Sequence, residues 1–149
     1  MMIQNKIKKE NILLDLEAAT KQEVIEKMSE KLYENGFINE AETFQTAVFE
    51  REAHMTTGIG NNLAIPHGKS ETVQESTVAF AKLKQPVEWG SLDQKPVKFV
   101  FLLAIKAADK GEEHLRVLAE LSEKLMDDEF VAQLKEASTR EAIVNALAF

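Results

Sequence analysis

The spacing of hydrophobic and polar residues predicts strands in the middle of the chain and helices on either side of them. Residues 77–83 (TVAFAKL) alternate between apolar and polar positions, which is typical of a strand with one buried face. Residues 97–105 (VKFVFLLAI) are rich in β-branched and aromatic side chains, which predicts a central, buried strand. Residues 11–16 (NILLDL) predict a shorter strand or extended entry segment.

Two helices are expected between this entry segment and the middle of the chain. Thr20 and Glu23 have capping-box spacing, and Gly36 is suited to the position just after a helix end. Apolar residues recur at helical spacing between them, at Val24, Ile25, Met28 and Leu32. A second helix is expected from near Asn39 to Glu52 or Ala53, with a buried face made of Ala41, Phe44, Ala47 and Val48.

The last third of the chain is predicted to be helical. Leucines recur at helical spacing and predict a helix over 112–126; they are Leu115, Leu118, Leu121 and Leu125. Asp128 opens a short helix, and Ser138 with Glu141 forms a second capping box before the final helix. Residues 85–96 (QPVEWGSLDQKP) predict turns with at most one edge strand. Helices on both sides of a strand-rich centre indicate an α/β sandwich with a mixed sheet.

Composition narrows the possible functions. The 149 residues suit one domain, and 25 acidic against 18 basic residues give a net charge of −7, which argues against a general nucleic-acid binder. The absence of cysteine excludes disulfides, cysteine-ligated metal sites and a cysteine nucleophile. The N-terminus is too polar for a signal peptide, and the longest apolar run, 99–105, is far shorter than the ~20 residues of a membrane helix. We therefore expect a soluble, cytoplasmic protein without membrane insertion.

His67 is the first candidate for chemistry. It lies between Pro66 and Gly68, two residues that shape the backbone, and follows a short apolar segment, 63–65. Such a segment can deliver the residue to the end of a sheet, where ligands of open α/β folds bind. The alternative is an ordinary turn histidine.

A glycine-rich segment lies just before His67. Gly58 and Gly60 expose backbone N–H groups that can bind an anion. Beside such an anion site, the His67 imidazole suggests nucleophilic phosphoryl transfer. The segment lacks the Lys-Ser/Thr ending of a P-loop, and neither a preceding strand nor a following helix matches a Rossmann fingerprint. Nucleotide binding is therefore not predicted.

Two further residues have both a structural and a functional interpretation. His114 lies in the first turn of the predicted helix 112–126, where it either packs against the core or donates a hydrogen bond to the same anion; on sequence alone, packing is favoured. Arg51 ends the second predicted helix, where it either complements the helix dipole or clamps a phosphoryl group. His54 has no supporting context. Lys69 and Lys110 are expected in solvated loops that border the site.

Four segments together resemble a known family: FERE at 49–52, TGIG at 57–60, AIPHGK at 64–69 and EHL at 113–115. They are similar to the enzyme IIA domain of the bacterial phosphoenolpyruvate-dependent sugar phosphotransferase system, fructose/mannitol class, and closest to fructose-type members. The resemblance covers nearly the whole chain, 1–149, as a single domain. It implies a three-layer α/β/α sandwich around a small mixed sheet.

The resemblance also implies a role for each site residue. His67 accepts a phosphoryl group from phospho-HPr and passes it to a cysteine of a IIB domain, which serves the membrane component IIC. His114 and Arg51 are implied to stabilise the phosphoryl group. We expect backbone N–H groups of a phosphoryl-binding loop, Thr57, Gly58, Gly60 and Asn61, to assist them. No nucleotide or metal cofactor is required, and the acceptor cysteine must lie on another polypeptide.

One departure and two alternatives remain open at this point. Many members of the family have glycine where this chain has Asn62, and only a small local change is expected because asparagine tolerates left-handed geometry. The chain is alternatively a regulatory, nitrogen-type relative that signals through its phosphorylation state. A metal site made of His54, His67 and His114 is disfavoured, because no i,i+4 histidine pair is present.

Overall fold

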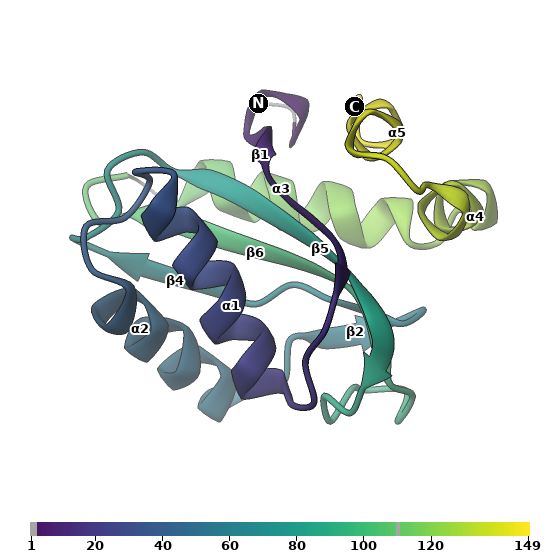
Figure 1. Cartoon of the computed structure of the whole chain (residues 1–149), viewed down its shortest axis with the longest axis horizontal. Coiled ribbons are helices and arrows are strands. Elements are labelled where there is room, and N and C mark those ends of the chain that lie inside the picture. The colour runs from purple at the N-terminus through teal and green to yellow at the C-terminus, as the bar shows by residue number, and fades with distance from the viewer. Residues whose placement is uncertain (1–2, 110) are drawn as a thin grey trace.

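The computed structural model describes residues 3–109 and 111–149 and is organised around a six-stranded mixed sheet (Figure 1). Its strands are β1 (Ile7–Leu16), β2 (Gly58–Gly60), β3 (Leu63–Ala64), β4 (His67–Ser70), β5 (Thr77–Val87) and β6 (Val97–Lys106). β5 and β6 form a long antiparallel pair, and β1 lies parallel to β5 at one edge. On the other side of β6, β3 and β4 pair with it in parallel at successive places, and β2 forms a hairpin with β3.

Helices cover both faces of this sheet. After the short 3-10 turn η1 (Ile3–Asn5), the helices are α1 (Lys21–Glu34), α2 (Ala41–His54), α3 (Glu112–Lys124), α4 (Asp128–Glu136) and α5 (Arg140–Ala146). Figure 1 shows α1 and α2 on one face and α3, α4 and α5 on the other. The structure therefore confirms the predicted α/β/α sandwich around a mixed sheet.

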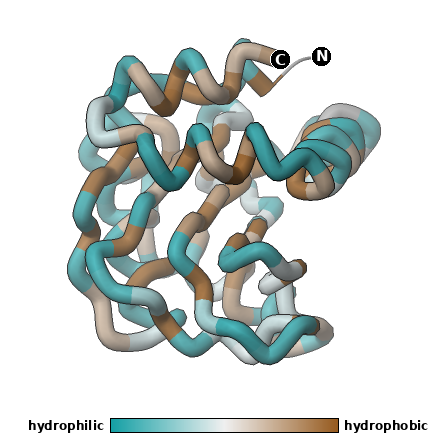
Figure 2. The backbone as a smooth tube through the Cα atoms, turned by 90° about the vertical axis from the view of Figure 1, so that its right-hand side faces the viewer, coloured by the Kyte–Doolittle hydropathy of each residue, from teal (hydrophilic) through white to brown (hydrophobic). Residues whose placement is uncertain are grey.

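Each face of the sheet has its own hydrophobic core because side chains alternate along the central strands. Phe80 and Phe101 face the core beneath α3, α4 and α5, whereas Ala79 and Leu102 face the core beneath α1 and α2. Figure 2 shows the hydrophobic stretches concentrated in the interior, with hydrophilic positions recurring along the helices. Within the described ranges, no helix combines the length and the apolar character needed to cross a membrane.

Of the predicted helix details, one is confirmed and others differ from the structure. The Thr20 cap is confirmed, since its side chain accepts a hydrogen bond from the Glu23 N–H. The second capping box is wrong: Thr139, not Ser138, caps α5 and accepts from the Ala142 N–H. Leu115, one of the four leucines that predict α3, is 61% exposed and so lies outside the buried face of this helix.

The strands are longer and more numerous than predicted. β1 starts four residues earlier than expected, at Ile7, and β5 continues through Pro86 to Val87. β2 and β4 are not predicted at all, because glycine and polar residues dominate their sequences. Both are short and obtain their backbone hydrogen bonds from neighbouring strands.

Gly68 permits α2 to lie close against β4. A Cβ atom at Gly68 would be 2.8 Å from Val48 Cγ2 and 3.2 Å from the Val48 backbone nitrogen. The residue is therefore needed for this close approach and not, as its place beside His67 suggested, for an unusual backbone conformation. The contact brings the last turn of α2 to the start of β4.

We expect Gly68→Ala to destabilise the chain by about 1–3 kcal/mol, because the added methyl must push α2 away from β4. Urea unfolding monitored by circular dichroism measures the change in the free energy of unfolding. Lys69→Ala, an exposed neighbour on the same strand, is the control and should change it by less than about 0.5 kcal/mol. Equal stability of Gly68→Ala and the unaltered chain would show that α2 is not held this closely.

Candidate functional site

His67 lies where the chain resumes pairing with β6 after a break. β3 ends at Ala64 and β4 begins at His67, and both strands pair with β6. In the break, Ile65 donates its N–H to the Thr57 carbonyl at 3.0 Å, and the Pro66 carbonyl accepts from the Leu103 N–H at 3.0 Å. Proline has no N–H to offer to a ladder, so the interruption falls at this residue. His67 is thus held at the start of a strand on the central sheet.

The His67 ring is oriented by the same break. Its Nδ1 lies 3.1 Å from the Ile65 carbonyl oxygen. A carbonyl accepts only, so Nδ1 carries the proton and Nε2 keeps its lone pair when the ring is neutral. Burial lowers the pKa of His67, and the charges of Arg51 and His114 act in the same direction against the opposing effects of the Ile65 carbonyl and Glu52. The lowered pKa favours the neutral ring at neutral pH, with the proton on Nδ1 and the lone pair on Nε2.

His114 comes to His67 from the other face of the sheet. It lies in the first turn of α3, and the centres of the two imidazole rings are 6.4 Å apart with a tilt of 35°. Burial lowers the pKa of His114, and the charge of Lys69 adds to this effect. Its Nδ1 is buried and has no hydrogen-bond partner among the described residues. The structure therefore brings the two histidine rings close together.

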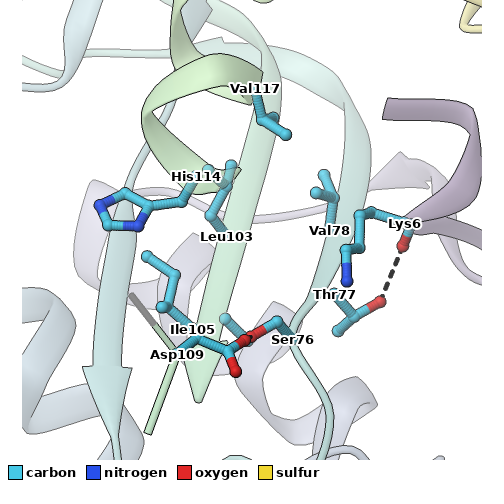
Figure 3. A pocket seen from close by; sticks show the side chains of 10 residues that line it. Lys6, Ser76, Thr77, Val78, Leu103, Ile105, Asp109, His114 and Val117 are labelled. Atoms are coloured by element: carbon cyan, nitrogen blue, oxygen red, sulfur yellow. Dashed lines mark hydrogen bonds between the residues drawn. The ribbon is translucent and has the colours of Figure 1, made fainter. Parts of the chain in front are cut away.

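A small pocket beneath the start of α3 adjoins His114 (Figure 3). Its walls are largely apolar and include Val78 of β5, Leu103 and Ile105 of β6 and Val117 of α3. Figure 3 shows the His114 ring at the opposite side of this pocket from Lys6. His67 does not line it. The pocket borders His114, while His67 lies outside it.

Arg51 reaches the site from the last turn of α2, one turn after the Val48 contact with Gly68. Its Nη1 donates to the Met55 carbonyl at 2.7 Å, which uses one of the five N–H donors of a guanidinium. Its positive charge lowers the pKa of His67, so the two groups are electrostatic neighbours. His54 is exposed at the end of α2. Lys110 lies outside the described residues.

The far end of the glycine-rich segment is a hairpin turn. Asn61 and Asn62 have φ values of 52° and 65°, the left-handed geometry at both central positions that joins strands such as β2 and β3. Asparagine is suited to this geometry, so the departure at Asn62 is accommodated locally. The Asn61 side chain donates to the Leu125 carbonyl at 2.7 Å and so anchors the end of α3.

This turn lies away from His67. Leu63 pairs with Phe99, and His67 pairs with Leu103. Four residues along β6 correspond to about 13 Å at roughly 3.3 Å per residue. The structure therefore does not bring Gly60 and Asn61 to His67.

At the start of the segment, the N–H groups of Thr57 and Gly58 already donate hydrogen bonds within the chain. Both the hydroxyl and the N–H of Thr57 donate to the Glu52 carboxylate, the N–H at 3.4 Å. The N–H of Gly58 lies 3.1 Å from Thr56 Oγ1, and a Cβ atom at Gly58 would overlap the Ser91 side chain. These contacts give Thr57 and Gly58 a supporting role in this structure instead of leaving their N–H groups for an anion.

Glu52 is a functional candidate that the sequence analysis missed. Its side chain is only 5% exposed and is bound by Thr57 and by Lys21, whose Nζ lies 3.4 Å from Oε2. The sequence does contain a signal for it, because Glu52 continues the buried α2 stripe of Phe44 and Val48 at four-residue spacing. A carboxylate on such a stripe needs partners inside the fold.

The described residues contain no group of three histidine or carboxylate side chains placed to hold a metal ion. Residues 5–149 match the family described as "Phosphoenolpyruvate-dependent sugar phosphotransferase system, EIIA 2". The chain belongs to this EIIA family. It is thus a phosphotransferase component of the kind that works through a phosphohistidine.

Two curated relatives show the fructose connection. The PTS system fructose-specific EIIA component of Haloferax volcanii is 34% identical over 139 residues, which are 93% of this chain and 90% of that protein. The PTS system fructose-specific EIIABC component of Bacillus subtilis is 35% identical over 147 residues, 99% of this chain but 23% of that protein. The chain thus spans most of the Haloferax volcanii protein but only about a quarter of the Bacillus subtilis protein.

Solved structures share the fold. Nitrogen regulatory protein IIA-Ntr from Neisseria meningitidis superimposes with a TM-score of 0.90 at 29% identity, covering 98% of this chain and 99% of that one. Enzyme IIA-mannitol of Escherichia coli, solved in complex with phosphorylated enzyme IIB-mannitol, gives 0.79 at 27% identity, covering 95% and 98%. Within this family, the EIIA domain has thus been seen bound to a IIB partner.

We expect Arg51→Ala to raise the pKa of His67, because removal of a nearby positive charge favours the imidazolium. The measurement is an NMR titration of the His67 ring between pH 4 and pH 9. Arg140→Ala is the matched control, since Arg140 also donates to a backbone carbonyl, that of Ile12, but does so from α5. An unchanged or lowered pKa in Arg51→Ala would place the guanidinium away from His67.

Proposed function

We propose that His67 is the phosphohistidine of this chain, accepts its phosphoryl group from phospho-HPr and transfers it to a cysteine of a IIB domain. The observation that carries this proposal is the Nδ1 contact with the Ile65 carbonyl, which presents Nε2 of a neutral ring as the nucleophile. The lowered pKa of His67 supports it, because an imidazolium has no lone pair for attack. The His114 ring lies near the His67 ring, and the positive charge of Arg51 acts on the His67 ring from the last turn of α2.

The transfer follows from this orientation. Nε2 attacks the phosphorus of the donor in line, a bond forms between them, and the phosphorus–nitrogen bond of phospho-HPr breaks with its electron pair returning to the donor ring. Nδ1 keeps its proton throughout, and the N–H stays hydrogen-bonded to the Ile65 carbonyl oxygen. In the second step, a IIB thiolate attacks the phosphorus, and Nε2 regains its lone pair. Holding the ring in this geometry is most of what the protein contributes.

Arg51 and His114 are proposed to stabilise the phosphoryl oxygens. A guanidinium presents a planar set of donors that fits phosphate, and among the described residues Arg51 donates one of its five N–H groups, to the Met55 carbonyl. His114 is neutral in the resting site because burial lowers its pKa. The negative charge of a phosphoryl group on His67 favours protonation of His114, which then donates a hydrogen bond to it. Thr57, Gly58, Gly60 and Asn61 support the site in this proposal without binding the phosphoryl group directly.

We further propose that the chain acts in the cytoplasm, on the side of the membrane where HPr and IIB meet it, and serves uptake of a fructose-type sugar. The names of the two curated relatives support the sugar class. The sugar itself is recognised by the membrane component IIC in this scheme. The EIIA chain contacts only its protein partners.

A regulatory role is the second candidate. It is supported by the superposition on nitrogen regulatory protein IIA-Ntr, whose TM-score of 0.90 exceeds the 0.79 obtained with enzyme IIA-mannitol. In that case the phosphorylated site is the same, but the phosphorylation state itself is the signal. Transfer to IIB separates the two roles, because only the transport role requires a fast onward step.

We expect His67→Ala to abolish phosphorylation while leaving the chain folded, because the variant lacks the Nε2 atom that acts as the nucleophile in this proposal. The assay uses radiolabelled phosphoenolpyruvate, enzyme I and HPr, with circular dichroism as the test of folding. His54→Ala is the matched control and should be labelled normally, since His54 is exposed. Labelling of folded His67→Ala at the normal level would refute the assignment.

A further inference from the structure

A buried polar cluster joins four elements behind the candidate site. Glu52 of α2 binds the hydroxyl and N–H of Thr57 and the ammonium group of Lys21 from α1. Trp89, in the segment between β5 and β6, donates its Nε1–H to Thr57 Oγ1 at 3.3 Å. Lys21 also donates to the Trp89 carbonyl at 3.3 Å and lies 5.8 Å from the centre of the indole ring. The Glu52 carboxylate is the centre of this cluster.

The cluster is connected to His67 through backbone hydrogen bonds of Thr57 and Ile65. Thr57, held by Glu52, uses its carbonyl to accept the Ile65 N–H at 3.0 Å. Ile65 in turn uses its carbonyl to accept His67 Nδ1–H at 3.1 Å. The line from Glu52 to the imidazole therefore consists of three successive hydrogen bonds across buried backbone. A shift of Thr57 therefore moves Ile65, whose carbonyl is the acceptor that sets the His67 tautomer.

We propose that Glu52 is a positioning residue for phosphoryl transfer: it fixes Thr57, and through Thr57 and Ile65 it holds the His67 ring with Nε2 free. This inference rests on the proposed role of His67. It gives a function to a buried charge that does not touch the reacting atoms. The neighbouring Arg51 meets the phosphoryl group, while Glu52, on the adjacent face of the same helical turn, holds the ring that receives it.

The chemistry of the cluster explains why glutamine does not suffice. One carboxylate oxygen accepts the Thr57 hydroxyl, and the other accepts the Thr57 N–H and Lys21 Nζ. An NH2 group in place of Oε2 would face two donors, the Thr57 N–H and Lys21 Nζ. In place of Oε1 it could donate to the Thr57 hydroxyl oxygen, but the hydroxyl proton would then lose its acceptor. Glu52→Gln therefore keeps the volume of the side chain and breaks one side of the cluster. An unpaired donor at a buried position is costly, so the cluster must rearrange.

The test compares Glu52→Gln with Glu50→Gln, an exposed glutamate in the same turn of α2. Two quantities are measured for each: the rate of phosphorylation by phospho-HPr and the 15N shifts of the His67 ring, which report the share of neutral rings with the proton on Nδ1. For Glu52→Gln we expect a rate roughly ten- to a hundredfold lower, the usual effect of a misplaced reacting group, and a smaller share of Nδ1–H rings. Glu50→Gln should match the unaltered chain in both.

Thermal unfolding of both variants separates positioning from loss of the fold. If Glu52→Gln does not fold, Lys21→Met tests the same cluster from its edge, and a reduced share of Nδ1–H rings is again expected. Unchanged ring shifts in a folded variant would overturn the proposal, as would an unchanged phosphorylation rate.

The ring shifts are measured without any phosphoryl donor. If the unaltered chain is not phosphorylated at all, the assignment of His67 as phosphoryl acceptor fails. The link between Glu52 and the His67 tautomer is still decided by the NMR comparison. The two proposals can therefore fail separately.

Discussion

The geometry of the candidate site depends on a single break in the strand that lies beside β6. Pro66 has no N–H, and around it the chain leaves the ladder after Ala64 and rejoins it at His67. Because of this break, the Ile65 carbonyl is turned to the His67 ring at 3.1 Å. A backbone acceptor on a rigid sheet thus decides which imidazole nitrogen keeps its lone pair.

Helix packing on the two faces of the sheet places the other groups of the site around this ring. The bare backbone of Gly68 lets α2 approach β4, and Arg51 follows one turn later on that helix. On the opposite face, α3 begins at the end of β6 and carries His114 in its first turn, with the two ring centres 6.4 Å apart. Burial favours the neutral form of both imidazoles, and the positive charges of Arg51 and Lys69 act on them in the same direction.

The sequence predicts the layers and most helices, because periodic apolar residues and caps such as Thr20 are local signals. It does not predict β2 or β4, whose short polar or glycine-rich sequences become strands only through pairing with β3 and β6. The glycine-rich segment suggests an anion-binding loop, but its two asparagines form a hairpin turn. The N–H and hydroxyl groups of Thr57 are hydrogen-bonded to the Glu52 carboxylate. Such differences depend on long-range contacts. The motifs around His67, His114 and Arg51 are local sequence signals, whereas the proximity of the two imidazole rings depends on the fold.

The central claim is that the Ile65 carbonyl holds Nδ1–H and leaves Nε2 of His67 as the nucleophile. The most direct measurement is a correlation between phosphorus and ring nitrogen in NMR spectra of the 15N-labelled chain after phosphorylation by phospho-HPr. We predict that the phosphorus is bonded to Nε2 of His67 and that Nδ1 remains protonated. A bond to Nδ1 of His67, or to either nitrogen of His114, would contradict the account.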